Sequence, residues 1–291
     1  MVETIENPTF KPQDFDRSRK KSGISAIVRL RNEEEFLELA LDSILPFFDE
    51  FVIVYHECAD RTPEIVESFA NEHPDRVKAY HYLPQVFPRG STQHEALPPD
   101  HASSFVHYCN FALSKATYQI RARWDGDMIA APEPLGRAIS QMRCLRPGTV
   151  RRPVSPWRMG FWWFKGVNLW DRDGRIEVVK SWPTSGSRKD HGFFPAGRRH
   201  VFRHYRASAY FRWRWLIPRF LGFLFYHVKG MKRDRGIGVF RFDKHPTSLY
   251  KERIEERWTD PPLMTLEEYW RTEPAARSLP KPDSLGIRPV R

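Results

Sequence analysis

The stretch Arg123-Trp124-Asp125-Gly126-Asp127 decides how this sequence is interpreted. The β-rich run 118–124 predicts a strand that ends in two carboxylates, and Gly126 allows a sharp turn between them. Because residues i and i+2 of a strand point the same way, Asp125 and Asp127 are expected to face one space beyond the strand end. Two carboxylates there suit a hard divalent cation that also binds the phosphates of a ligand. On spacing alone, an ordinary polar turn is the commoner explanation.

Strand-like and helix-like patterns alternate in the sequence before this stretch. The β-rich run 23–30 is followed by Asn32, a helix N-cap candidate with three glutamates in the first turn. Two more strand-like runs cover 51–55 and 77–82, and apolar residues at helical spacing follow each of them. The helices are expected to begin near Asn32, Thr62, Ser103 or Ser104, and Pro132. This order predicts an α/β fold with a mostly parallel sheet flanked by helices.

The chain is expected to divide into four segments. They are a polar N-terminal arm at 1–21, the alternating strands and helices at 22–145, a mixed or antiparallel half of the same domain at 146–272, and a proline-rich tail at 273–291. Within the third segment, Asp171 to Gly174 is typical of a hairpin turn. The apolar run 209–228, interrupted by arginines, is interpreted as a buried helix, with a membrane-interface segment as the alternative.

Composition restricts the partners and the compartment. A net charge of +11 and a pI near 9.7 indicate an anionic partner, such as a nucleotide or a phospholipid headgroup. No zinc-finger, basic-zipper or RNA-recognition pattern is present, so nucleic acid is not expected. The three cysteines form neither a disulfide framework nor a CxxC zinc pattern. The N-terminus lacks an apolar leader, and no apolar run reaches the roughly 18 residues of a spanning helix. We therefore expect a cytoplasmic protein.

Three stretches resemble the family 2 glycosyltransferases of the GT-A fold. They are Ile24 to Ile44, with a strand, an Asn-Glu corner and a helix; Val52 to Ile65, with the second strand and its loop; and the helix and strand from Asn110 to the Asp125/Asp127 pair. The chain departs from the family at the end of the second strand, where Tyr55 and His56 replace two acidic residues. Glu57 follows directly and is the candidate that could contact the base instead.

The resemblance implies a Rossmann-like GT-A sheet with an acceptor-binding region in the C-terminal half. It implies a metal-dependent, inverting enzyme that moves a sugar from a nucleotide-sugar donor to a glycan or lipid-linked acceptor. The C-terminal patterns are similar to those of bacterial polysaccharide and lipopolysaccharide transferases. The positive charge and the Arg- and Trp-rich segment 209–220 suggest peripheral contact with the anionic inner face of a membrane.

Candidate roles follow for individual residues. On the resemblance, Asp127 and His227 hold Mn²⁺ or Mg²⁺, and Asp190 is the general base. The expected nucleotide-sugar-binding residues are Arg29, Arg31, Glu57, Asp60, Asp125, Lys229 and Lys232. Several alternatives stay open: His191 could be the metal ligand, Asp171 and Asp173 are rival bases that fit a turn better, and Asp190 and His227 could be ordinary loop and helix residues.

Two other functions are compatible with the sequence. A sugar nucleotidyltransferase would need a glycine-rich phosphate loop after the first strand, but residues 29–32 contain no glycine. A non-catalytic GT-A-like protein could bind glycan or an anionic polymer through its basic surface, although such a protein would have no need of the aspartate pair.

Overall fold

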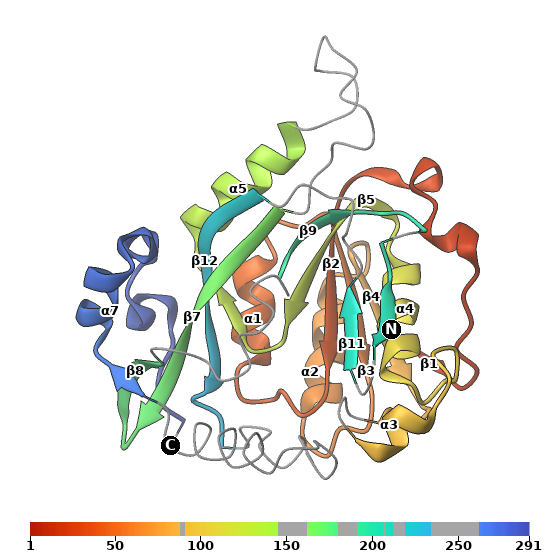
Figure 1. The fold of residues 1–291 in the computed structure, drawn as a ribbon, viewed down its shortest axis with the longest axis horizontal. Helices are drawn as coiled ribbons and strands as arrows, with labels where there is room; N and C mark the ends of the chain where they lie inside the picture. Colours follow the sequence, from red (N-terminus) through yellow and green to blue (C-terminus); the bar gives the residue numbers. More distant parts are fainter. Residues whose placement is uncertain are drawn as a thin grey trace.

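The protein is one large α/β sheet with helices packed on both faces (Figure 1). The computed structural model describes residues 1–87, 91–144, 162–179, 191–198, 200–205, 208–211, 219–233 and 262–290. Its strands are β1 Val2–Ile5, β2 Lys21–Leu30, β3 Glu50–Tyr55, β4 Val77–Tyr82, β5 Tyr118–Asp125, β6 Met128–Ala130, β7 Trp162–Arg172, β8 Arg175–Val179, β9 Gly192–Pro195, β10 Phe202–Tyr205, β11 Ser208–Phe211, β12 Arg219–Gly230 and β13 Leu263–Met264. Its α-helices are α1 Leu37–Ile44, α2 Thr62–Glu72, α3 Thr92–Ala96, α4 Phe105–Lys115, α5 Pro132–Cys144 and α7 Leu266–Thr272. Short 3-10 turns are η1 Pro12–Phe15, η2 Arg17–Arg19, η5 Pro274–Ser278 and η6 Pro282–Leu285.

The sheet has a parallel half and a mixed half. Strands β1, β4, β3, β2 and β5 are adjacent in that order and all parallel. From β5 onward the strand directions are mixed: β9 is antiparallel to β5, β7 is antiparallel to β9, and β12 runs parallel to β7 and antiparallel to β6. This architecture confirms the predicted α/β fold with a mostly parallel sheet and a mixed C-terminal region. The strand order reverses between β2 and β5, which is the place where open α/β sheets bind ligands.

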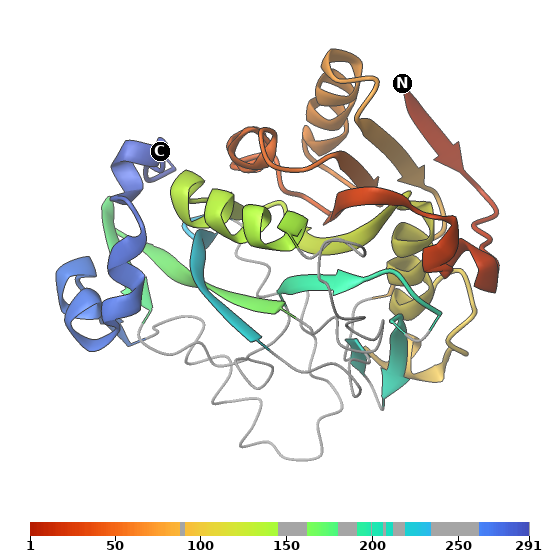
Figure 2. The same ribbon diagram turned by 90° about the horizontal axis from the view of Figure 1, so that it is seen from above.

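Apolar packing explains why the parallel half forms. The side chains of β3 are all buried, as expected for a strand covered on both faces. One core cluster joins the sheet to α1, α2 and α5, and a second joins the opposite face to α4. Figure 2 shows these two layers from above, with the sheet between them. No helix in the described part of the chain is both long and apolar enough to cross a membrane.

The segment 219–230 corrects one prediction, because it is strand β12 and not part of a buried helix. Both faces of this strand are covered, so Leu224, Phe225 and Tyr226 are buried in succession. Such an unbroken apolar run has no period that separates a buried strand from a buried helix. Residues 212–218, the Arg- and Trp-rich part of the run, lie outside the described residues.

The two ends of the chain are more ordered than the sequence suggests. The expected arm contains β1, which pairs in parallel with β4 at the edge of the sheet. The proline-rich tail forms η5 and η6, and it buries Ala276, Leu279 and Ile287 in a third core cluster. These contacts hold β1 and the tail against the rest of the fold. The boundary between the two halves at residues 145 and 146 stays a prediction.

Glu50, the first residue of β3, joins three parts of the sheet although it is only 3% exposed. Its carboxylate accepts hydrogen bonds from Ser25 Oγ (2.6 Å), Lys78 Nζ (2.6 Å), and the backbone N (2.8 Å) and Oγ1 (2.7 Å) of Thr117. Burial alone would raise the pKa of Glu50, but these hydrogen bonds outweigh it and lower the pKa from its usual 4.5.

Replacing this carboxylate tests its structural role. We expect Glu50→Gln to lower the free energy of unfolding by about 2–4 kcal/mol at pH 7, because buried donors lose a charged acceptor. The lowered pKa means that the contribution of Glu50 is complete above its usual pKa and is lost as the pH falls through the folded-state value. The difference between the proteins should therefore shrink in acid. Denaturant unfolding at neutral and acidic pH measures both effects.

Glu38→Gln is the matched control, because Glu38 is exposed on α1. It should change the free energy of unfolding by less than about 0.5 kcal/mol. Equal effects of the two substitutions would contradict the role assigned to Glu50.

Candidate active site

Asp125 ends β5 at the strand switch and lies in register with Arg29 of the neighbouring β2. Arg123 donates hydrogen bonds from Nε (3.2 Å) and Nη2 (2.8 Å) to the Asp125 carboxylate, and His191 Nε2 lies 3.2 Å from Asp125 Oδ2. Burial opposes ionisation, but Arg123 and His191 outweigh it and hold the pKa of Asp125 well below its usual range. Asp125 is therefore a carboxylate at neutral pH.

Asp127, on the far side of the glycine turn, pairs with the histidine predicted from the sequence. Its Oδ1 lies 3.1 Å from His227 Nε2, and its residue is 5% exposed. His227 Nδ1 lies 2.9 Å from Asn168 Oδ1, which orients the imidazole. Burial alone would raise the pKa of Asp127, but the contact with His227 and the charge of Lys232 lower it. His227 is on β12, so the alternative of an ordinary helix histidine is excluded.

Gly126 is required at the centre of this turn by close packing. A Cβ at this position would lie 2.6 Å from Leu30 Cδ2 and 3.1 Å from Glu33 Cγ. Glu33 forms an ion pair with Lys232 Nζ at 2.9 Å, and Lys232 Nζ also lies 3.3 Å from the carbonyl of Asn32. Burial and the nearby charge of Asp127 raise the pKa of Glu33 to about 8. The start of the loop after β12 is thereby attached to the loop beneath the aspartates.

The loops after β2 and β3 are fastened to each other at the same edge of the sheet. Asn32 adopts a positive φ of 53°, and its Oδ1 accepts a hydrogen bond from Ala59 N at 2.8 Å. Asn32 therefore links the two loops and is not the predicted N-cap of a helix. Helix α1 begins only at Leu37. The backbone N of Glu33 donates to Thr62 Oγ1 at 2.8 Å. These bonds fix the rim of the site against the first two helices.

Four of the expected nucleotide-sugar-binding residues lie at this edge of the sheet. They are Asp125, described above, and Arg29, Arg31 and Lys229. Arg29 contacts Cys109 Sγ, and its guanidinium lies over the rings of Phe105 (5.4 Å) and Phe202 (5.1 Å). Its charge also helps to lower the pKa of Asp125. Burial lowers the pKa of Lys229, while the charges of Asp127 and Glu33 act in the opposite direction. Arg31 lies near His56. Burial of His56 and the positive charge of Arg31 lower the pKa of the His56 imidazole to about 3.

The remaining expected residues have other contacts in the structure. Lys232 is engaged with Glu33, as described above. Asp60 uses both carboxylate oxygens to accept backbone N–H groups, from Glu34 (3.0 Å) and Thr62 (3.0 Å). Glu57, at a positive φ of 41°, lies 3.7 Å from His56 Nδ1. The candidate base Asp190 lies outside the described residues.

The rival aspartates form the turn that the sequence indicated. Asp171 Oδ1 accepts a hydrogen bond from Gly174 N at 2.8 Å, within the β7–β8 hairpin. Asp173 is exposed and has a positive φ of 53°, as a tight hairpin turn requires. Both belong to the hairpin tip and not to the Asp125/Asp127 pair.

Sequence reasoning missed three residues of the site. Arg123 is part of the stretch that decided the fold, but its bond to Asp125 depends on how the strand end bends. Asn168 is brought to His227 only by the pairing of β7 with β12. Glu33 was expected to lie in the first turn of a helix and interact favourably with the helix dipole, whereas it packs against Gly126. His191, weighed as an alternative ligand, is the partner of Asp125.

The donor atoms of this site suit a divalent cation that a ligand completes. Asp125, Asp127 and His227 offer carboxylate and imidazole donors at one strand end, next to the Lys229 ammonium. No group of three or more His, Cys, Asp or Glu side chains in the described ranges is already arranged around a metal position. This is compatible with ions that bind through one or two carboxylates and rely on substrate phosphates for the rest.

Residues 13–120 match the family model of CgtA, a beta-1,4-N-acetylgalactosaminyltransferase. The match extends from η1 to the first residues of β5 and covers a little over a third of the chain. It confirms the predicted resemblance to nucleotide-sugar-dependent glycosyltransferases for this part. The aspartate pair itself lies just beyond the matched residues. No sequence among the curated proteins matches the chain.

Several solved glycosyltransferase structures are similar to parts of the chain. TarS residues 1–349 of S. aureus is 14% identical, with a TM-score of 0.42 over 82% of this chain and 71% of that one. A mannosyltransferase from Pyrobaculum calidifontis, in complex with GDP-Man and Mn²⁺, is 21% identical, with a TM-score of 0.35 over 52% and 37%. Glucosyl-3-phosphoglycerate synthase from Mycobacterium tuberculosis, with Mg²⁺ and UDP, is 15% identical, with a TM-score of 0.32 over 56% and 50%. The chain thus spans about half of the synthase and less of the mannosyltransferase.

Breaking the buried ion pair under the site should destabilise the protein. At pH 9, above the raised pKa of Glu33, Lys232→Met leaves the Glu33 carboxylate buried without its cation, and we expect a loss of about 3 kcal/mol in the free energy of unfolding. Adding Glu33→Gln to this variant should recover part of the loss, because the unpaired charge is removed. Chemical denaturation of the two single variants and the double variant gives the coupling energy.

The neighbouring Arg233→Met provides the control. The Arg233 guanidinium is exposed and lies 3.5 Å from Glu35, so its removal should cost less than about 1 kcal/mol. The proposed importance of the buried pair is wrong if Lys232→Met costs no more than this.

Proposed function

We propose that this protein is a metal-dependent, inverting glycosyltransferase that moves a sugar from a nucleotide-sugar donor to a glycan or lipid-linked acceptor. The observation that carries the proposal is the ionised pair Asp125 and Asp127 at the strand switch, each facing a histidine. The family match of the preceding residues supports the donor class. Neither support depends on the partial likenesses to solved structures.

In this proposal Asp127 and His227 hold Mn²⁺ or Mg²⁺, and Asp125 faces the donor beside them. The cation would neutralise the charge that develops on the departing diphosphate. Lys229 adds an ammonium group near the same carboxylates, where it can pair with phosphate oxygens. Arg123 and His191 keep Asp125 ionised and oriented, and Asn168 orients the His227 imidazole. Lys232 is bound to Glu33 and supports the turn. Lys229 alone is therefore proposed as the phosphate-binding lysine.

The nucleoside is proposed to lie at the ends of β2 and β3. Arg31, His56 and Glu57 border this space, and the low pKa of His56 keeps its imidazole neutral. Glu57 remains the candidate for a hydrogen bond to the base. Asp60 instead organises the loop, because both of its oxygens are engaged by backbone N–H groups.

The acceptor hydroxyl must lose a proton as it attacks the anomeric carbon. Asp190 is proposed to take this proton from the side opposite the leaving group, and one such displacement inverts the anomeric centre. Asp190 precedes His191 in the sequence, and His191 Nε2 lies 3.2 Å from Asp125 Oδ2. The family description makes N-acetylgalactosamine the first sugar to test. Polysaccharide or lipopolysaccharide synthesis at the inner face of a membrane would fit the basic charge of the chain.

Nucleotide binding tests the donor site. Calorimetric titration with UDP, GDP, dTDP and CMP should show one nucleotide that binds in the presence of Mn²⁺ and not in its absence. Asp127→Ala should weaken this binding by at least about tenfold, because a metal ligand is removed. Failure of every nucleotide to bind, with or without Mn²⁺, would contradict the proposal and favour a non-catalytic glycan-binding protein.

Asp173→Asn is the control for this titration. Asp171 and Asp173 repeat the Asp-x-Asp spacing, but they occupy the exposed hairpin tip, and asparagine tolerates the positive φ there. The Asp173→Asn variant should bind nucleotide like the wild-type protein.

Turnover tests the base. With a donor identified by titration, Asp190→Asn should lower kcat by about 10²–10⁴-fold while the nucleotide Kd stays unchanged. Release of nucleotide in the presence of a glycan acceptor measures this. An unchanged kcat would exclude Asp190 as the general base. It would not bear on the roles proposed for Asp125 and Asp127.

A further inference from the structure

A second, unassigned cationic site lies on β5, away from the aspartate pair. Arg121 is 0% exposed, and its Nε, Nη1 and Nη2 atoms are all buried without a hydrogen-bond partner among the residues that the structure describes. Its guanidinium lies 5.6 Å from the centre of the Phe15 ring, which is itself buried. A fully buried guanidinium with unsatisfied donors is costly, since all of its N–H groups have lost water. This cost calls for a partner that the described part of the chain does not supply.

The surroundings of Arg121 are cationic. Lys20 and His200 are close enough for the Arg121 charge to contribute to lowering their pKa values, after the larger effect of burial. Arg17 is half-buried in the same region and acts on His200 in the same way. His200 Nδ1 lies 3.0 Å from the carbonyl of Pro195, so this ring nitrogen is already engaged. The segment 12–20, β5 and the corner after β9 therefore bring positive groups together.

The acidic groups nearby are already used. Glu50 helps to keep Arg121 charged, but its oxygens accept bonds from Ser25, Lys78 and Thr117. Asp16 accepts bonds from Ser18, and its Oδ2 lies 3.3 Å from Arg198 Nη2. A bound water would satisfy only some of the Arg121 donors and would not offset the excess positive charge. An oxyanion would do both, because guanidinium groups bind phosphate-type oxygens in a bidentate manner.

We propose that Arg121, with Arg17 and Lys20, binds a small tetrahedral oxyanion of the phosphate class between η1–η2, β5 and the β9–β10 corner. The anion would attach the N-terminal segment 12–20 to the sheet. It would enter through the short 3-10 turns that cover Arg121, since such turns have few backbone bonds to break.

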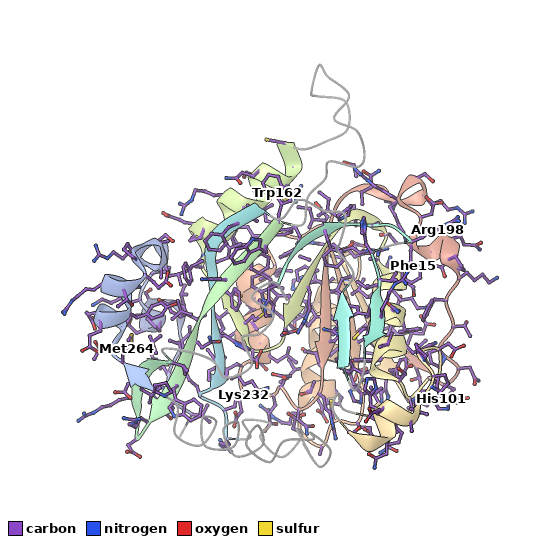
Figure 3. All side chains as sticks on the ribbon, viewed as in Figure 1. Phe15, His101, Trp162, Arg198, Lys232 and Met264 are labelled. Carbon is purple, nitrogen blue, oxygen red and sulfur yellow. The ribbon has the colours of Figure 1, made fainter. Side chains whose placement is uncertain are left out.

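This site is distinct from the donor site. Arg121 precedes Asp125 by four residues of an extended strand, which is about 13 Å. Figure 3 shows Phe15 and Arg198 near one edge of the molecule and Lys232, next to the donor site, well away from them. The proposal therefore does not depend on the proposed glycosyltransferase activity.

Thermal unfolding in phosphate-free buffer, with inorganic phosphate added at low millimolar concentration, tests the site. Phosphate should raise the Tm of the full-length wild-type protein in a saturable way, because it binds only the folded state. Sodium chloride at the same ionic strength should not. In Arg121→Met the phosphate Kd should rise more than about tenfold, and in Arg17→Gln it should rise severalfold. Arg121→Met should be at least as stable as the wild-type protein without phosphate, since an unpaired buried charge is gone.

Lys229→Met separates this site from the donor site and should keep the phosphate effect. Loss of the effect in Lys229→Met with retention in Arg121→Met would place the phosphate at the donor site and overturn the proposal. A rise in Tm of the same size in all variants would be the non-specific effect of an excluded salt, and would also overturn it. The same conclusion holds if phosphate leaves the wild-type Tm unchanged. Should Arg121→Met fail to fold, Arg17→Gln and Lys229→Met still distinguish the two sites.

Discussion

The site depends on one constraint, the close packing of the Asp125-Gly126-Asp127 turn between the loop after β2 and strand β12. Gly126 leaves no room for a side chain above Leu30 and Glu33. Glu33 is in turn bound to Lys232, just after β12, and His227 of β12 contacts Asp127. The two carboxylates therefore lie where the parallel and mixed halves of the sheet meet, and both halves position them.

Charge at this point is balanced by direct contacts. Two ionised aspartates are stabilised by Arg123, His191 and His227, with Lys229 close by, in a region that excludes much of the solvent. In the proposed function, a cation and a diphosphate would take the place of a histidine–carboxylate contact, so that the added charges face opposite charges. The hydrogen bonds between the loops after β2 and β3 would keep the rim fixed during such an exchange. The charges and the loop geometry thus both support the proposed donor site at this edge of the sheet.

The sequence predicted the parallel half well, because local signals determine it. Strand β4 was predicted with its observed bounds, and Ser104 caps α4 as one of the two expected serines. The contact between Asp127 and His227 was expected only from the family resemblance. Prediction failed where distant segments decide the structure: β12 was taken for a helix, and Asn168 and Glu33 acquire their roles through sheet pairing and loop packing. No local pattern carries that information.

The central claim is that Asp127 and His227 hold a divalent cation together with a nucleotide. Pulsed electron paramagnetic resonance of Mn²⁺ bound in the presence of nucleotide tests this directly, because a coordinated imidazole gives a nitrogen coupling to the metal. The account predicts this coupling in the wild-type protein and its loss in His227→Gln. A bound Mn²⁺ without nitrogen coupling, or the same coupling in the variant, would contradict it.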